Sequence, residues 1–354
     1  MFASLPMFVV GVAFVAAAAA VWVAGVRLSI TTEQLAGRFH FGQAVGGLIV
    51  LAIATNLPEI AISVTAARSG NVEVAVGNIL GGIAIQTVVL VLIDAVVRRP
   101  SGPLTYRASS LVIAIEGLMV IVILAAVLMV AQLPASATVG RVEIGSIVIV
   151  LLWVGGLVLV RRAHTAIPWR VPDRPAQQHE AGDGGADDER DEASRPRTGR
   201  TIMVFAAAAV VTLIGGFVLE QSGDVLATKF GLSGVIFGAT FLALATSLPE
   251  ISTGIASSRT GQDDLAISDI FGGNAFLPTL FLLISLIAGG SVLTDAQPTD
   301  LYLTALGIIL TTIYVVGLIF RALRKTFGIG RDSLAVLIVY LLGLVGLIVI
   351  AGAG

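Results

Sequence analysis

Residues 51–60 read LAIATNLPEI, and residues 242–251 read LALATSLPEI. The two stretches are 191 positions apart, and at that shift residues 51–84 align with residues 242–275 without a gap, with 15 of 34 positions identical. Chance does not produce such agreement, so the chain contains an internal repeat. Each copy places a proline, followed directly by a glutamate, inside a long apolar segment.

The sequence around both copies is strongly apolar. Hydrophobic residues make up 56% of the 354 residues, charged residues only 12%, and the mean hydropathy is +0.97. This is more apolar surface than a soluble core can hide, and a helix of about 20 apolar residues crosses a bilayer core of about 30 Å. A lipid-facing β-barrel is excluded because its strands would alternate apolar and polar residues, whereas residues 111–130 are almost continuously apolar.

We therefore predict an all-α integral membrane protein with ten transmembrane helices. The first segment lacks the basic start of a secretory signal, so we interpret it as a membrane helix. The ten segments are residues 6–26, 43–66, 74–97, 108–131, 142–160, 201–219, 232–256, 265–288, 300–320 and 332–353.

The repeat sets the expected domain organisation. A shift of five helices is odd, so the two copies enter the membrane from opposite sides and form two inverted five-helix repeats. The first covers residues 1–160, with its repeated segment at about 43–97, and the second covers residues 201–354, with its repeated segment at about 232–288. Residues 161–200 are rich in Pro, Gly, Arg and acids, a composition that predicts a disordered cytosolic linker.

Basic residues predict the orientation. With the N-terminus outside, 18 of the 21 Lys and Arg residues fall in inside loops or the linker, and only Arg68, Arg141 and Lys229 fall outside. We expect a multi-pass protein of the cell membrane with both termini outside and residues 161–200 in the cytosol. The lipid bilayer is then the main partner, no nucleic acid is expected, and the oligomeric state stays open.

The two Pro-Glu pairs carry the chemistry. Pro58 and Pro249 have no N–H for the carbonyls of Ala54 and Ala245 four residues earlier, so those oxygens need another partner at membrane depth. A cation would serve. The adjacent glutamates cost about 2.5–3.5 kcal/mol each to insert, which indicates a function. The chain has no cysteine, so disulfides, thiolate chemistry and cysteine metal sites are excluded.

Two Thr-x-Leu-Pro-Glu helices, each followed about twenty residues later by a Gly-Asn-like or Gly-Gly-Asn-like helix, resemble the α-repeats of the calcium/cation antiporter superfamily, the sodium/calcium exchangers. The resemblance covers both repeats and nearly the whole chain. It implies a secondary-active antiporter that exchanges Ca²⁺, or a similar cation, for H⁺ or Na⁺ by alternating access. The cations are then cargo, no cofactor is expected, and the chain is not expected to be an enzyme.

The resemblance also implies a ligand set at the centre of the chain. Hard oxygen ligands of this kind suit Ca²⁺, which takes about 6 to 8 of them. The candidates are the carboxylates of Glu59 and Glu250, hydroxyl or carbonyl oxygens of Thr55 and Thr246, backbone oxygens of Ala54 and Ala245, and the nearby polar residues Asn56, Ser247, Asn78, Gln86, Asp269 and Asn274.

The chain departs from the family pattern at several positions, one of which is Asn56, where a small hydroxyl residue is common. Gly82 and Gly273 stand where serine is usual, and Leu277 stands where Asn or Asp is usual. Because Na⁺ sites depend on such hydroxyls while protons need only titratable carboxylates, the departures favour H⁺ over Na⁺ as the coupling ion. Asp269 shares a helical face with Gly273 and is either a further ligand or a hydrated residue at the mouth of the site.

Other interpretations stay open. Glu116, about eight residues into the fourth predicted helix, is either a proton relay or a packing partner. The missing hydroxyls also suit a transport-inactive relative that acts as a membrane sensor or scaffold. An intramembrane hydrolase is disfavoured, because the predicted spans contain no paired aspartates, no Ser/Lys or Ser/His pair and no His-rich metal motif.

Overall fold

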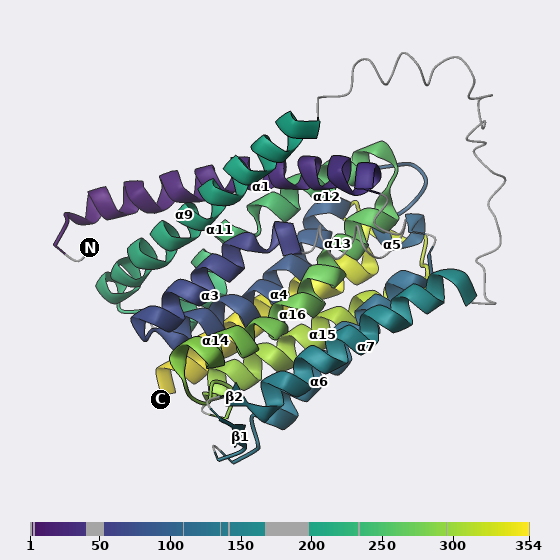
Figure 1. Cartoon of the computed structure of the whole chain (residues 1–354). Coiled ribbons are helices and arrows are strands. Elements are labelled where there is room, and N and C mark those ends of the chain that lie inside the picture. Colours follow the sequence, from purple (N-terminus) through teal and green to yellow (C-terminus); the bar gives the residue numbers. More distant parts are fainter. Residues whose placement is uncertain are drawn as a thin grey trace.

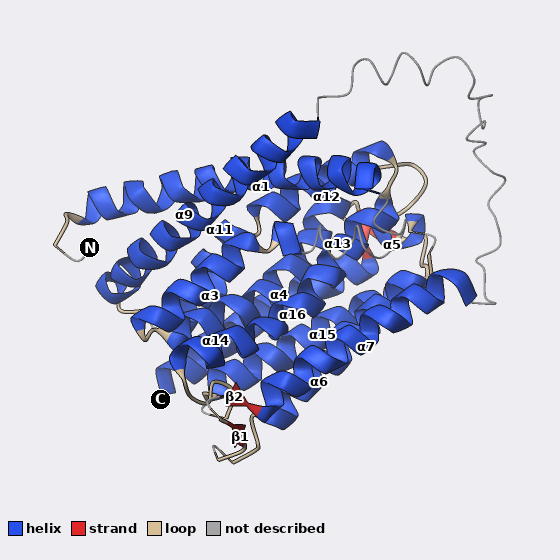
Figure 2. Ribbon diagram, in the orientation of Figure 1, coloured by secondary structure: helices blue, strands red, loops and turns tan. Residues whose placement is uncertain are grey.

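The computed structural model describes residues 2, 4–39, 53–108, 110–134, 136–140, 142–166, 198–232, 234–294 and 296–353. These residues are almost entirely helical, with two very short antiparallel hairpins (Figure 2). The helices are α1 (Met7–Phe39), α3 (Leu57–Ser69), α4 (Val72–Val96), α5 (Leu104–Arg107), α6 (Val112–Val130), α7 (Ile144–Ala166), α9 (Thr198–Phe230), α10 (Gly234–Phe237), α11 (Ala243–Thr246), α12 (Leu248–Thr260), α13 (Asp263–Phe276), α14 (Leu280–Ala288), α15 (Pro298–Phe320) and α16 (Arg331–Ala353). The π-helical turn η1 (Gly238–Leu242) joins α10 to α11, the 3₁₀ turn η2 (Leu277–Thr279) joins α13 to α14, and the hairpins pair β1 (Thr138–Val139) with β2 (Val142–Glu143) and β3 (Lys325–Thr326) with β4 (Ile329–Gly330).

The expectation of a multi-pass membrane protein is confirmed. Within the described residues eight helical segments are long and apolar enough to cross a bilayer, and the bent pair Gly234–Thr246 and Leu248–Thr260 makes up to nine. The segment expected at 43–66 lies partly outside the described residues, so the count of ten remains a prediction. Residues 161–166 and 198–200, assigned to the linker from composition, are helical, and residues 167–197 lie outside the described residues.

The helices form a bundle with α4 at its centre (Figure 1). Helix α4 contacts α3, α12, α13, α15 and α16, and nearly all of its length is buried. Helices α1 and α9 pack along each other on one flank, while α6, α7 and α15 form the opposite flank. We name the two ends of the bundle after the elements found there, the α5 end and the β1 end.

Several contacts occur as pairs related by the 191-residue shift. Gly25 of α1 packs against Pro249, and Gly216 of α9 packs against Ala61 and the carbonyl of Pro58. A Cβ added at either glycine would come within 2.6 Å of its neighbour, so only glycine permits these approaches. Each long helix therefore crosses the Pro-Glu segment of the other half of the chain.

A second pair of contacts joins the third helical segment of each half to the last helix of the other. The carboxylate of Asp94 in α4 accepts hydrogen bonds from the N–H groups of Leu104 and Gly330, each at 2.7 Å, and from the Ser333 hydroxyl at 2.9 Å. Ser285 of α14, 191 positions after Asp94, accepts a bond from the N–H of Glu143 at 3.2 Å. The halves are thus interlocked at both ends of the bundle.

Candidate cation site

Both Leu-Pro-Glu segments lie directly after a helix break. In the second half α11 ends at Thr246, Ser247 has φ −81° and ψ 1°, and α12 starts at Leu248 with a bend of 44°. In the first half Asn56 has φ −88° and ψ 14° before α3. Proline fits the first turn of a helix, where an N–H would have no intrahelical partner. Each break therefore puts its glutamate at the positive end of a helix dipole.

Glu59 and Glu250 are brought together at the centre of the bundle. Their side chains are 0% and 2% exposed, and the two carboxylates are close enough to interact electrostatically. Thr246, from the other repeat, lies beside the carboxylate of Glu59. The site is therefore built across the two halves of the chain, as the repeat predicts.

These carboxylates have no partner among the described side chains that would neutralise them. None of their four oxygens accepts a hydrogen bond within normal geometry, and the ion pairs of Arg107 join it to Asp94 and Asp263 rather than to either glutamate. Two buried carboxylates without a counterion are strongly destabilising unless a cation or protons accompany them. The arrangement therefore requires positive charge from outside the protein.

Amide groups lie beside Gly273, one of the two glycines that stand where serine is usual. A Cβ built at Gly273 would lie 3.1 Å from Nδ2 of Asn56 and 3.5 Å from Oε1 of Gln86, and both amide atoms of Gln86 lack a hydrogen-bond partner. At Gly82, the equivalent glycine, the neighbour is instead Cδ1 of Leu277 at 3.6 Å. The place of the missing serine hydroxyl is thus bordered by amides at Gly273 and by a hydrocarbon at Gly82.

The remaining expected ligands are buried close to the breaks. The hydroxyls of Thr246 and Ser247 donate to the carbonyl of Ala243 at 3.2 and 2.8 Å, which leaves their oxygen lone pairs available. Ala54, Thr55 and Ala245 are also buried.

The two asparagines behave differently from each other. Asn78 is fully buried and neither amide atom has a partner. Asn274 donates from Nδ2 to the carbonyl of Ile83 at 3.4 Å and to the hydroxyl of Thr87 at 3.2 Å, so its amino group joins α13 to α4. The Oδ1 oxygens of both asparagines lack a hydrogen-bond partner, so either oxygen could face a cation, and Asn78 differs in having a free amino group as well.

Asp269 and Glu116 are two further carboxylates that the sequence singled out. Asp269 is half-buried, its Oδ2 is 3.4 Å from the hydroxyl of Thr253, and its charge acts on Glu250. Glu116 is 7% exposed and accepts a hydrogen bond from Ser268 at 2.6 Å. Both interpretations of Glu116, as a proton relay and as a packing partner, stay predictions.

Sequence reasoning missed Ser63, Thr87 and Thr253. Ser63 is fully buried, its hydroxyl has no partner, and it lies one helical turn after Glu59, a spacing that could have indicated it. Thr87 could not be found in this way, because its partner Asn274 is distant in sequence. Thr253 follows Glu250 by three residues, and its importance depends on where α1 packs.

The oxygen donors determine which metal ions the site could hold. Among the described residues no group of three or more His, Cys, Asp or Glu could hold a metal ion. A bound cation would therefore rest on two carboxylates together with amide, hydroxyl and carbonyl oxygens, which is the chemistry of hard cations such as Ca²⁺ and Na⁺ rather than of zinc.

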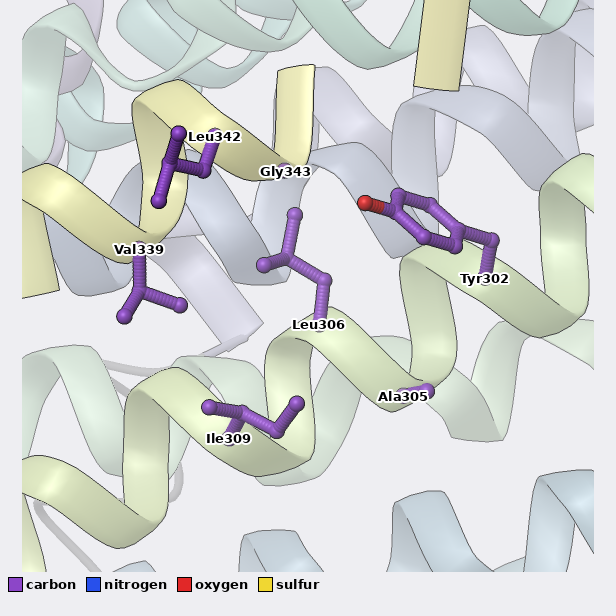
Figure 3. A pocket seen from close by; sticks show the side chains of 7 residues that line it. All are labelled: Tyr302, Ala305, Leu306, Ile309, Val339, Leu342 and Gly343. Carbon is purple, nitrogen blue, oxygen red and sulfur yellow. The ribbon is translucent and has the colours of Figure 1, made fainter. Parts of the chain in front are cut away.

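A separate hollow of about 230 Å³ lies between α15 and α16 and is lined mainly by aliphatic side chains with Tyr302 at one end (Figure 3). Its lining contains no carboxylate. It therefore offers no site for a cation.

Two relatives resemble the chain in sequence over about three quarters of its length. A putative antiporter, CaxA of Alkalimonas amylolytica, is 27% identical over 280 residues, which are 78% of this chain and 80% of that protein. The inner membrane protein YrbG of Escherichia coli K12 is 28% identical over 271 residues, or 75% and 76% of the two chains.

Two solved exchangers share the fold. An H⁺/Ca²⁺ exchanger, CAX, superposes with a TM-score of 0.69 at 14% identity over 95% of this chain and 82% of its own. The sodium-calcium exchanger NCX_Mj gives a TM-score of 0.58 at 16% identity over 96% and 99% of the two chains. The family model described as sodium/calcium exchanger protein matches residues 9–162 and 200–349. The chain therefore belongs to the sodium/calcium exchanger protein family.

Proposed function

We propose that this protein is a secondary-active antiporter that exchanges Ca²⁺, or a similar cation, for H⁺ by alternating access. The observation that carries the proposal is the pair Glu59 and Glu250, two buried carboxylates without a counterion at equivalent helix breaks. Membership of an exchanger family supports it. In this proposal the chain is a transporter rather than an enzyme, and the cations are cargo.

The chemistry of exchange follows from the charge of the pair. With both carboxylates ionised, the site carries two negative charges that one divalent cation neutralises. When the cation leaves, one proton on each carboxylate neutralises the same charge. The site is then neutral in both loaded states, so either form can move through a low-dielectric barrier without the cost of an unpaired charge.

Sodium is the alternative coupling ion. The amide oxygens of Asn56 and Gln86 beside Gly273 could replace a serine hydroxyl as Na⁺ ligands. At the equivalent Gly82, the atom that an added Cβ would meet is the hydrocarbon Cδ1 of Leu277. Oxygen atoms therefore replace a serine hydroxyl beside Gly273 and not beside Gly82. Such a site is better suited to protons than to several Na⁺ ions.

The proposed architecture is ten transmembrane helices in two inverted repeats, divided by the segment around residues 161–200. The contacts related by the 191-residue shift support it, since Gly25 meets Pro249 and Gly216 meets Pro58. The excess of basic residues on one side supports an orientation with this segment in the cytosol and both termini outside.

Proteoliposomes that contain only this protein test the function. We expect Ca²⁺ uptake to follow an imposed pH gradient in the absence of Na⁺. Uptake that requires a Na⁺ gradient and ignores pH would replace H⁺ by Na⁺ as the coupling ion. No flux of Ca²⁺, Sr²⁺, Mn²⁺ or Na⁺ under either gradient would contradict transport and favour a sensor or scaffold role.

A further inference from the structure

We infer that the groove between α1 and α12 is the route by which a hydrated cation reaches Glu250 from the α5 end, with Thr253 and Asp269 forming a transient binding station along it. The inference deepens the proposed function, since it assigns an entry path and an outer site to the same carboxylates. It rests on the lining of the groove, on contacts inside it and on a comparison with the equivalent surface of α3.

The groove has a volume of about 260 Å³ and is lined by hydroxyl, amide and aliphatic side chains, among them Ala256 of α12. From α12 and the turn after it come Ser252, Thr253, Ser257, Thr260 and Gln262, and from α1 come only apolar side chains. The α12 hydroxyls recur at helical spacings and follow one face of the helix for about two turns. None of the lining side chains carries a charge, so the groove can hold water and let an ion pass without trapping it.

Thr253, which lines the groove, connects it to Asp269. Its hydroxyl oxygen lies 3.1 Å from the carbonyl of Pro249, 3.3 Å from that of Glu250 and 3.4 Å from Oδ2 of Asp269. Asp269 is half-buried and its charge acts on Glu250. A cation that leaves the groove therefore meets a hydroxyl and a carboxylate before it reaches the buried pair.

The equivalent surface of α3 is closed. Positions 252, 253 and 257 correspond, 191 residues earlier, to Ala61, Ile62 and Ala66, which are apolar and at most 5% exposed. Helix α9 packs closely there, with Gly216 against Ala61. The two Pro-Glu helices thus differ in access, with the route open along α12 and shut along α3.

The two halves of the chain also differ at the position of Asp269, which belongs to the proposed binding station. Asp269 corresponds to Asn78, which is fully buried and uncharged. At this pair of equivalent positions the second half therefore has a carboxylate where the first half has an amide. The station should raise the local concentration of cations on the α5 side alone.

Thiol labelling tests the route, because the natural chain has no cysteine. We compare Ser257→Cys with its matched control Ala66→Cys, using a cationic, membrane-impermeant methanethiosulfonate applied from the α5 side or the β1 side. We expect Ser257→Cys to react from the α5 side on the order of tenfold faster than Ala66→Cys reacts from either side, since a thiol becomes reactive where water reaches it. Ser257→Cys that stays unreactive, or equal rates for the two variants, would overturn the route.

Transport from each side tests the station. In sidedness-controlled proteoliposomes we expect Asp269→Asn to raise the half-saturating Ca²⁺ concentration roughly tenfold on the α5 side, the change that about 1.4 kcal/mol of lost attraction gives, and to leave the β1 side unchanged. Asp224→Asn in α9 is the control. Equal changes on both sides, or none, would overturn the station. The labelling experiment does not depend on transport. If Ser257→Cys reacts in a protein that shows no flux, the proposed function is contradicted while the hydrated groove is supported.

Discussion

The surroundings of Gly273 and Gly82 differ although the two glycines occupy the same position in the two repeats. Gly273 faces the amides of Asn56 and Gln86, whereas Gly82 faces the side chain of Leu277. Gln86 and Leu277 are themselves equivalent positions, 191 residues apart. The repeat therefore supplies two matched carboxylates, while a few unmatched residues make the surroundings of Gly273 polar and those of Gly82 apolar.

The largest effect is expected where the two halves are alike. Glu59→Gln and Glu250→Gln each keep the shape of the side chain and remove one of the two charges that hold a divalent cation. We expect exchange to fall to near background in both variants, measured as Ca²⁺ flux into proteoliposomes. Glu73→Gln, an exposed carboxylate at the start of α4, is the control and should transport normally. Normal flux in both site variants would show that the pair does not bind the cation.

Topology gives an all-or-none result. If the halves are inverted and residues 161–200 are cytosolic, a cysteine replacing Ser136 should react with an impermeant thiol reagent in intact cells. A cysteine replacing Ser194 should react only after lysis. Equal labelling of both in intact cells is incompatible with the proposed orientation.

The polar surroundings of Gly273 and the apolar surroundings of Gly82 predict unequal effects of equivalent substitutions. Gln86→Leu removes the amide beside Gly273 and should lower the apparent Ca²⁺ affinity roughly tenfold, since a lost polar contact costs about 1–1.5 kcal/mol. Leu277→Gln adds an amide beside Gly82, where the natural chain has a hydrocarbon, and the apparent Ca²⁺ affinity should change far less. Concentration dependence of Ca²⁺ flux measures both. Equal losses in the two variants would mean that the surroundings of the two glycines are functionally alike.

The smallest effect on transport is expected at the contacts that interlock the halves, where substitutions should act on stability instead. Asp94→Asn weakens three hydrogen bonds to a carboxylate, each worth about 1.5–3 kcal/mol, whereas Ser285→Ala at the equivalent position removes a neutral acceptor worth about 1 kcal/mol. Thermal unfolding in detergent should therefore start at a lower temperature in Asp94→Asn than in Ser285→Ala. The reverse order would contradict this account of the interlock.

Sequence reasoning predicted the membrane class, the helical fold and the burial of Glu59 with Glu250, because these depend on hydropathy and on a repeat that is visible in one chain. Helix ends were less predictable. Helix α1 continues to Phe39, 13 residues beyond the end of the segment predicted at 6–26, since no proline interrupts the polar residues that follow. An apolar window marks the bilayer core rather than the end of a helix.

The finer features of the site depend on packing between distant segments. The neighbours of Gly273 come from the break at Asn56 and from α4, and the groove along α12 depends on how α1 approaches it. Neither can be derived from spacing within one helix. The missing hydroxyls at Gly82 and Gly273 were visible in the sequence, whereas the amides that fill one of the two places were not.

Equilibrium binding tests the central claim most directly. Purified protein in detergent, dialysed against radioactive Ca²⁺, is expected to bind one ion per chain at the carboxylate pair. Glu59→Gln and Glu250→Gln should each abolish that binding, while Asp269→Asn, whose carboxylate lies outside the pair, should retain it. Retention of the ion with unchanged affinity in either glutamate variant would contradict a site shared by the two halves of the chain.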